Sequence, residues 1–269
     1  MSSLRHLLNV NELGLGTTPI LLIHGFGCDQ TVWRRLVPVL ETDYRLFLVD
    51  LAGFGCAAPE AYDKERHSTP SGHAEDIVAL CDELGLENAI VIGHSIGGTI
   101  AMLASIQRPQ AFQRLVMICS SARYLDDPPD YHGGYTHEQL DGLLQLMELN
   151  YLDWAGTVSK VALGDAGTPV HQQNLQQRFL AISPDVMRPL ARSIFHGDTR
   201  HHLTHVTVPS LIVQTAQDAM VPLEAAQFLQ AHLASSELVV LDAGGHYPQL
   251  TAPDLLAEAL QESIQAQGD

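Results

Sequence analysis

Six short apolar runs alternate along the chain with longer stretches in which apolar positions recur at helical spacing. Short apolar runs bounded by turn residues are typical of buried parallel strands, and the helical spacing indicates helices that cover a sheet. The alternation predicts an α/β fold with a mostly parallel sheet flanked by helices. The expected strands are 19–23, 44–50, 89–92, 114–119, 210–214 and 237–241, and the expected helices include 31–40, 71–84, 99–107, 222–233 and 254–264.

The alternation stops between Ser120 and about Pro189, where helical stretches such as 137–150 and 151–163 follow one another. Loops after parallel strands surround the ligand site, so we expect this insertion to roof it. The chain is therefore divided into an α/β core, 1–121 and 190–269, and a helical cap, 122–189. Apolar residues of the cap, and Phe195 shortly after it, supply either a ligand lining or ordinary packing. Those of the cap are Tyr124, Tyr135, Met147, Trp154, Val158, Leu163 and Phe179.

The spacing of apolar residues changes from that of a strand to that of a helix most abruptly around Ser95. Residues 89–92 predict a buried strand, 99–107 predict a helix, and G-H-S-I-G lies between them. Such a tight turn needs glycine where a side chain would collide, and it exposes the central serine at the top of the sheet. The motif favours a nucleophile elbow, and the alternative is a glycine-rich turn with a solvent-facing serine.

A second glycine-rich turn, H-G-F-G at 24–27, follows the first expected strand. Glycines let backbone N–H groups approach a bound group closely. The N–H groups of Phe26 and of Ile96, the residue after the serine, would together form an oxyanion hole. A plain strand-to-helix turn is the alternative interpretation of H-G-F-G.

Two further residues complete a candidate catalytic triad with Ser95. A serine hydroxyl needs an imidazole to take its proton and a carboxylate to orient that imidazole. Asp218 and His246 each follow the end of an expected strand, and the strand ends of an open α/β sheet face one side. Their order along the chain, serine, then aspartate, then histidine, is the order expected for an elbow nucleophile.

Composition and charge narrow the choice of function. The 269 residues, 46% of them hydrophobic, suffice for one large domain, and no apolar run reaches the length of a membrane span. A formal charge of −17 disfavours nucleic acid and anionic membranes as partners. Residues 1–10 lack the pattern of a signal peptide, so we expect a soluble, cytoplasmic protein. We also expect its four cysteines to be buried free thiols.

No cofactor or metal is expected. Gly14-Leu15-Gly16 is followed by Thr-Thr-Pro rather than by a helix, which argues against a dinucleotide site. The histidines at 196, 201, 202 and 205 match no standard metal-binding spacing, and a solvated surface explains them better.

With these residues in place, the chain resembles the α/β hydrolases over its whole length. More narrowly it is similar to the RsbQ-like family of bacterial stress-response regulators and to the plant strigolactone and karrikin receptors. The segment Y-L-D-D-P-P-D-Y-H-G-G-Y, at 124–135, is the most specific of the motifs. The others are H-G-F-G-C-D-Q-T-V-W (24–33), L-A-S-I-Q-R-P (103–109) and G-G-H-Y-P-Q-L (244–250).

The resemblance implies a four-helix cap inserted after the sixth strand, and the catalytic roles already given to Ser95, Asp218 and His246. It implies pocket walls at Tyr124, Trp154, Val158, Phe195 and Met220, to which Tyr135 is added from the cap. The implied substrate is a small apolar ester or lactone such as a butenolide, hydrolysed through an acyl-enzyme.

A second hypothesis is a slow, ligand-sensing signalling protein whose partner, in RsbQ-like systems, is a PAS-containing serine/threonine phosphatase. The chain departs from the plant receptors at Gly97, at the loop 50–55 and at Ala219-Met220, which argues against hormone perception. A haloperoxidase-like or carbon–carbon hydrolase is a weaker alternative that the same triad permits.

Overall fold

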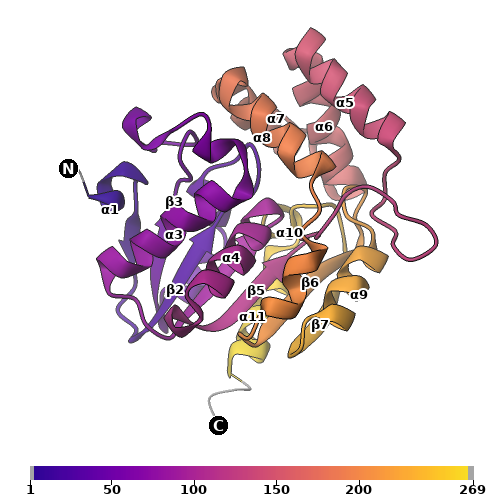
Figure 1. Ribbon diagram of the computed structural model, residues 1–269. Helices are drawn as coiled ribbons and strands as arrows, with labels where there is room; N and C mark the ends of the chain where they lie inside the picture. Colours follow the sequence, from indigo (N-terminus) through magenta and orange to yellow (C-terminus); the bar gives the residue numbers. More distant parts are fainter. Residues whose placement is uncertain (1–2, 266–269) are drawn as a thin grey trace.

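The computed structural model describes residues 3–265, and one sheet lies at its centre (Figure 1). Seven strands form the sheet in the order β1-β3-β2-β4-β5-β6-β7. Only β1 runs antiparallel to its neighbour, so the prediction of a mostly parallel sheet is confirmed. The strands are β1 (Asn11–Leu13), β2 (Thr18–Ile23), β3 (Tyr44–Val49), β4 (Ala89–His94), β5 (Phe112–Ile118), β6 (Ser210–Gln217) and β7 (Ser236–Gly244).

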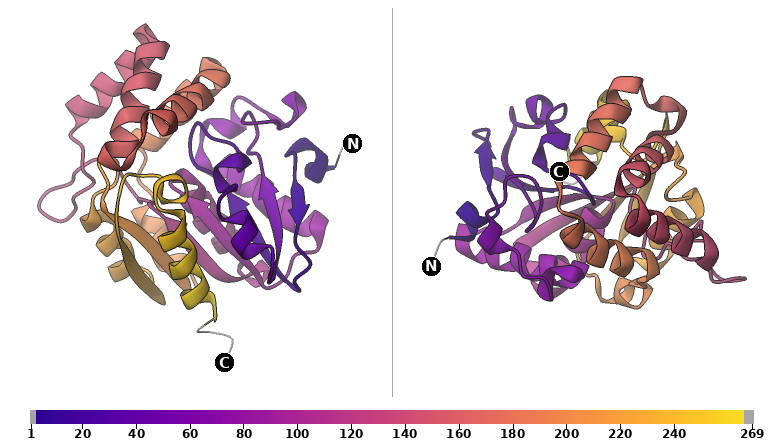
Figure 2. Two further views of the ribbon diagram at one scale, coloured as in Figure 1. Left: turned by 180° about the vertical axis from the view of Figure 1, so that it is seen from behind. Right: turned by 90° about the horizontal axis from the view of Figure 1, so that it is seen from above.

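Helices cover both faces of the sheet (Figure 1, Figure 2). α3 (Pro70–Leu84), α4 (Ile96–Gln107) and α9 (Leu223–His232) lie on one face, and α11 (Pro253–Gln265) lies on the other. Since both faces are covered, every residue of β4 is buried, which explains its uninterrupted apolar run. Three helices of four residues each complete the core: α1 (Leu4–Leu7), α2 (Val37–Leu40) and α10 (Pro248–Thr251). Among residues 3–265, no helix is both long and apolar enough to cross a bilayer.

The prediction of one continuous helix over 31–40 is wrong. The segment forms a 3₁₀ turn, Gln30–Trp33, followed by the short helix α2. Pro38 has no N–H to donate to the carbonyl four residues earlier, and its ring crowds that carbonyl, so a helix cannot pass through it. In the structure Pro38 lies in the first turn of α2, where a backbone donor is not needed.

Four helices form the cap between β5 and β6. They are α5 (His137–Leu149), α6 (Tyr151–Leu163), α7 (Pro169–Ala181) and α8 (Pro184–His196). A polar side chain caps the N-terminus of each one by accepting a backbone N–H: Thr136, Asn150, Thr168 and Ser183. The cap is therefore divided by local sequence signals, and it lies over one end of the sheet (Figure 1).

The position of the cap in the strand order needs a correction. The insertion follows the fifth described strand, β5, and not the sixth, because only one short antiparallel strand, β1, precedes the parallel strands within residues 3–265. The predicted boundary between cap and core at residue 189 falls inside α8. That boundary stays a prediction.

Two histidines, His67 and His73, are buried at the N-terminal end of α3. His73 is fully buried, and within residues 3–265 neither of its ring nitrogens has a hydrogen-bond partner. Its ring lies 4.9 Å from that of His67, which donates through Nε2 to Asp76 at 2.8 Å. Burial lowers the pKa of His73 to about 3, so this ring is neutral in the folded protein.

Replacing His73 with phenylalanine should flatten the dependence of stability on pH. The unfolded chain binds a proton on His73 below pH 6.5, whereas the folded chain does not until about pH 3, so stability is lost as pH falls through this window. Relative to H73F, the wild type should lose about 2 kcal/mol between pH 7 and pH 5, as measured by urea unfolding. His6→Phe, at an exposed histidine, serves as control, and parallel curves for H73F and wild type would contradict the assignment.

Candidate active site

Ser95 lies at a sharp turn between β4 and α4. Its backbone has φ 53° and ψ −123°, a strained conformation for a residue with a side chain. The turn closes tightly because a Cβ on Gly93 would lie 2.2 Å from the carbonyl oxygen of Gly97. A Cβ on Gly97 would likewise lie 2.5 Å from the carbonyl of His24 in the neighbouring chain segment. The geometry is that of a nucleophile elbow, and the helix N-terminus begins directly after the serine.

The structure brings Ser95, Asp218 and His246 together from three different strand ends. The hydroxyl of Ser95 lies 2.9 Å from Nε2 of His246, and Nδ1 of the same ring lies 2.8 Å from Oδ2 of Asp218. Asp218 follows β6, and His246 follows β7. The side chains of the aspartate and histidine are 0% and 4% exposed, so this chain of hydrogen bonds is shielded from water.

Asp218 is held as a carboxylate. Burial by itself would raise its pKa, but the charge and hydrogen bond of His246 and the N–H groups of Met220 and Val221 outweigh burial and lower it. Those two N–H groups donate to Oδ1 at 2.8 and 3.1 Å. An ionised Asp218 selects the His246 tautomer that carries its proton on Nδ1. The lone pair on Nε2 then accepts from the serine.

A small, enclosed cavity of about 30 Å³ lies at Ser95. That is room for about two water molecules. Among the predicted wall residues, the structure places Tyr124, Val158, Phe195 and Met220 in the lining, and the predicted oxyanion residues Phe26 and Ile96 lie there as well. Phe179, considered only as a general cap residue, also lines it, together with Ala162, Ile194 and Tyr247, which the sequence analysis missed.

Two predicted wall residues are not in this lining. Trp154 is fully buried one layer behind, with its ring 6.3 Å from Phe26 and 5.4 Å from Phe179. Tyr135 is not in the lining; its hydroxyl donates to the carbonyl of Ala219 at 3.0 Å and lies 3.4 Å from the sulfur of Met220. Helical spacing did hold a signal for Ala162, because it lies four residues after Val158 on α6 and therefore on the same helix face.

Tyr124 makes a contact that its role as a wall residue did not suggest. Its hydroxyl lies 3.4 Å from the hydroxyl of Ser95. Burial raises the pKa of Tyr124 far above its usual range, so the phenol keeps its proton. The cavity thus contains a neutral hydrogen-bond donor beside the hydroxyl of Ser95.

His94 supports the loop that carries His246. Its Nε2 donates to the backbone carbonyl of His246 at 2.7 Å, and its ring lies 5.0 Å from the ring of His246 and 4.6 Å from that of Tyr247. Burial lowers the pKa of His94 to about 3, so this donor is a neutral imidazole. A Cβ on Gly25 would lie 2.6 Å from its Nδ1, which explains the glycine there.

One group of side chains within residues 3–265 has the spacing of a metal site: Cys119, Asp218 and His246, with their ligand atoms within 4.8 Å of one another. Its chemistry does not fit a metal. The aspartate and histidine are hydrogen-bonded to each other at 2.8 Å, and burial raises the pKa of the Cys119 thiol well above its usual range. A thiol that keeps its proton is a poor ligand, because metals bind the thiolate.

Comparison with known proteins identifies the family. Residues 20–259 match the alpha/beta hydrolase family. The chain belongs to this family. That membership confirms the resemblance to α/β hydrolases and the prediction of a hydrolase enzyme.

Relatives of this alpha/beta hydrolase include plant receptors and a bacterial enzyme. The karrikin insensitive 2 receptor CA of Petunia hybrida is 38% identical over 95% of each chain. A strigolactone esterase of Arabidopsis thaliana is 35% identical over 96% of each. The solved structure of a hydrolase from Oleispira antarctica superimposes with a TM-score of 0.95 at 32% identity, covering 97% of this chain and 96% of that one. The similarity to plant receptors is confirmed, and the narrower RsbQ-like assignment stays a prediction.

Removing the ring of His94 should slow turnover more than it weakens binding. We expect His94→Ala to lower kcat by about 10²-fold with little change in KM, because the backbone of His246 loses its anchor and the base is misplaced. His94→Gln, which keeps an N–H donor of similar reach, should restore part of the loss. Steady-state kinetics on a short ester measure both, with circular dichroism to confirm folding. A folded H94A with wild-type kcat would refute this positioning role.

Proposed function

We propose that this hydrolase cleaves small apolar esters or lactones through Ser95, His246 and Asp218. The observation that carries the proposal is the buried hydrogen-bond chain from the serine hydroxyl through the imidazole to the carboxylate, at 2.9 and 2.8 Å. The strained backbone of Ser95 supports it, since such conformations persist at residues that act.

In the proposed mechanism, Nε2 of His246 takes the hydroxyl proton while Oγ of Ser95 attacks the carbonyl carbon. The developing oxyanion accepts hydrogen bonds from the N–H groups of Phe26 and Ile96 at the positive end of α4. His246 then returns the proton to the leaving oxygen, and the acyl-enzyme forms. Water repeats the sequence and releases the acid, with Asp218 stabilising the imidazolium in both steps.

The cavity supports a substrate that presents a small, uncharged group to the serine. About 30 Å³ is smaller than a butenolide ring, so a lactone of that size requires the lining to move. Phe179 and Phe195 come from cap helices α7 and α8, and Val158 comes from α6. Movement of these helices relative to the core would enlarge the cavity, whereas short acyl groups need the least movement.

A second candidate function is a ligand sensor. The enclosed cavity favours it, because a ligand that must displace the cap is exchanged slowly and changes the outer surface when it binds. The names of the plant relatives, a karrikin receptor and a strigolactone esterase, support a lactone ligand for such a role. A PAS-containing phosphatase as the partner also belongs to this proposal.

Ser95→Ala should abolish hydrolysis. We expect kcat/KM for p-nitrophenyl acetate to fall by about 10⁴-fold or more, and Asp218→Asn to cost about as much, because both remove a member of one catalytic unit. Ser71→Ala, at an exposed serine of α3, is the matched control. With a butenolide, mass spectrometry should find the acyl adduct on Ser95 or His246. An S95A enzyme with normal turnover would eliminate the proposal, and slow single turnover with a retained adduct would favour the sensor.

Phe179→Ala should shift the preference toward longer acyl chains. Removing the ring enlarges the cavity, so kcat/KM for p-nitrophenyl butyrate relative to the acetate should rise about tenfold. Phe228→Ala, on α9 and outside the cavity lining, is the control. An unchanged acetate-to-butyrate ratio in F179A would show that this ring does not limit the acyl group.

A further inference from the structure

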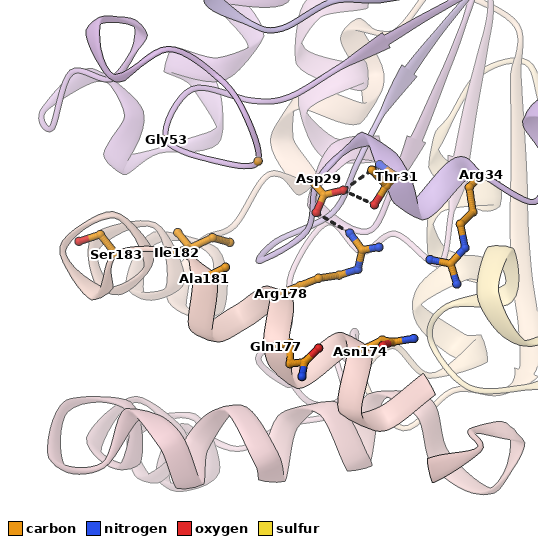
Figure 3. A pocket seen from close by; sticks show the side chains of 11 residues that line it. Asp29, Thr31, Arg34, Gly53, Asn174, Gln177, Arg178, Ala181, Ile182 and Ser183 are labelled. Carbon is orange, nitrogen blue, oxygen red and sulfur yellow. Dashed lines mark hydrogen bonds and ion pairs between the residues drawn. The ribbon is translucent and has the colours of Figure 1, made fainter. Parts of the chain in front are cut away.

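A second cavity, of about 460 Å³, opens between the cap and the core. Its walls come from α7 and the turn after it on the cap side, and from the core loops 29–34 and 53–55 (Figure 3). We call it the outer pocket. None of its lining residues belongs to the cavity at Ser95, so the mechanism above does not use it. Its walls carry mostly polar side chains, among them the charged or amide groups of Asp29, Arg34, Asn174, Gln177 and Arg178.

One ion pair crosses this pocket from core to cap. Asp29 pairs with Arg178 of α7, and its other oxygen, Oδ1, accepts the backbone N–H of Thr31 at 2.8 Å as well as the Thr31 hydroxyl. Burial alone would raise the pKa of Asp29, but the hydrogen bonds from Thr31 and the charge of Arg178 outweigh it and hold the pKa below its usual range. Both carboxylate oxygens are therefore occupied, which leaves little for a cation to bind.

Apart from Asp29, most of the polar side chains in the outer pocket offer hydrogen-bond donors. Arg178 reaches Asp29 through one guanidinium nitrogen, and Arg34 makes no ion pair within residues 3–265. In Figure 3 both guanidinium groups extend into the same gap, with the amides of Asn174 and Gln177 along α7 below them. The chain has 14 Lys and Arg residues against 31 Asp and Glu. The lining contains two arginines and one carboxylate, Asp29, and is therefore locally positive on an acidic protein.

We propose that the outer pocket binds the carboxylate or phosphate group of a small organic anion. The planar guanidinium groups of Arg34 and Arg178 match the paired oxygens of such a group, and the amides of Asn174 and Gln177 supply further donors. Arg178 is followed directly by Phe179, which lines the cavity at Ser95. An anion held by Arg178 thus contacts α7, the cap helix whose next residue lines the cavity at Ser95.

The anionic group that the outer pocket binds belongs to one of two molecules. It is either the acidic end of an ester substrate or a separate ion. The first rests on the proposed function, because the carbonyl of that ester must reach Ser95. The second requires only that the pocket bind an anion. The two sources share the same recognition chemistry, so direct binding tests the site and kinetics distinguish the sources.

Direct binding uses inorganic phosphate and succinate at constant ionic strength, with chloride as the reference anion. We expect saturable binding by calorimetry and a rise in Tm, with Kd weakened at least about tenfold in Arg34→Gln. Asn174→Asp, which adds a negative charge to the same wall, should weaken binding as well. Arg192→Gln, at a 66% exposed arginine of α8, should bind as the wild type does. Unchanged binding in folded R34Q and N174D, or none beyond chloride, would overturn the proposal.

Kinetics compare 4-carboxyphenyl acetate with its neutral analogue, 4-carbamoylphenyl acetate. If the pocket holds the acidic end of a substrate, KM for the carboxylate ester should be about tenfold lower, R34Q should remove this preference, and phosphate should compete. If the anion is separate, both esters should have similar KM and respond equally to phosphate. Saturable phosphate binding that changes neither rate also assigns the pocket to a separate ion.

The variant Ser95→Ala distinguishes failure of the outer-pocket proposal from failure of the proposed function. Ser95 is outside the outer pocket, so S95A should lose hydrolysis of both esters and still bind phosphate. Hydrolysis that survives in S95A would contradict the serine mechanism and leave the anion site standing. Loss of phosphate binding in R34Q with an intact serine mechanism confirms both.

Discussion

The catalytic end of this sheet depends on how closely α4 approaches the chain beside it. A Cβ at Gly97 would collide with the carbonyls of Ile23 and His24 at 2.5 Å, and a Cβ at Gly93 would collide with Gly97 itself. Because both positions are glycine, the helix begins immediately after β4, and Ser95 is forced into a left-handed conformation at the tip. These two close contacts set the serine, the helix N-terminus and the H-G-F-G turn within reach of one small group.

The two cavities differ in the charge of the side chains around them. Among residues 3–265, the lining of the cavity at Ser95 includes no Asp, Glu, Lys or Arg, and the carboxylate of Asp218 beside it is satisfied by two backbone N–H groups and His246. Buried charges without partners are costly, so this cavity suits an uncharged reacting group. The outer pocket offers unpaired donors at a more open site, where a charged group keeps part of its hydration. Together they suit a molecule, or a pair of molecules, with one neutral and one acidic end.

The cap is attached to the core at two places that bear on both cavities. Its two connections to the sheet meet where Arg123 pairs with Asp198 at 2.6 Å, and its far side is joined to the core by Asp29 and Arg178. The aromatic side chains between these attachments fill most of the space above the serine. Arg178 of α7 lines the outer pocket and the next residue, Phe179, lines the cavity at Ser95, so one cap helix contributes to both cavities.

The sequence by itself determined the α/β class, the elbow at Ser95 and the three residues of the candidate triad, because period, glycine spacing and strand ends are local properties of the chain. It could not determine which cap residues reach the serine. Trp154, Val158 and Ala162 share one face of α6, yet only the last two line the cavity while Trp154 lies behind Phe26, since depth depends on how the whole helix is tilted. The support from His94, the contact from Tyr124 and the outer pocket likewise join residues far apart in the chain. Only tertiary packing decides such contacts, because no local pattern records which distant side chains meet.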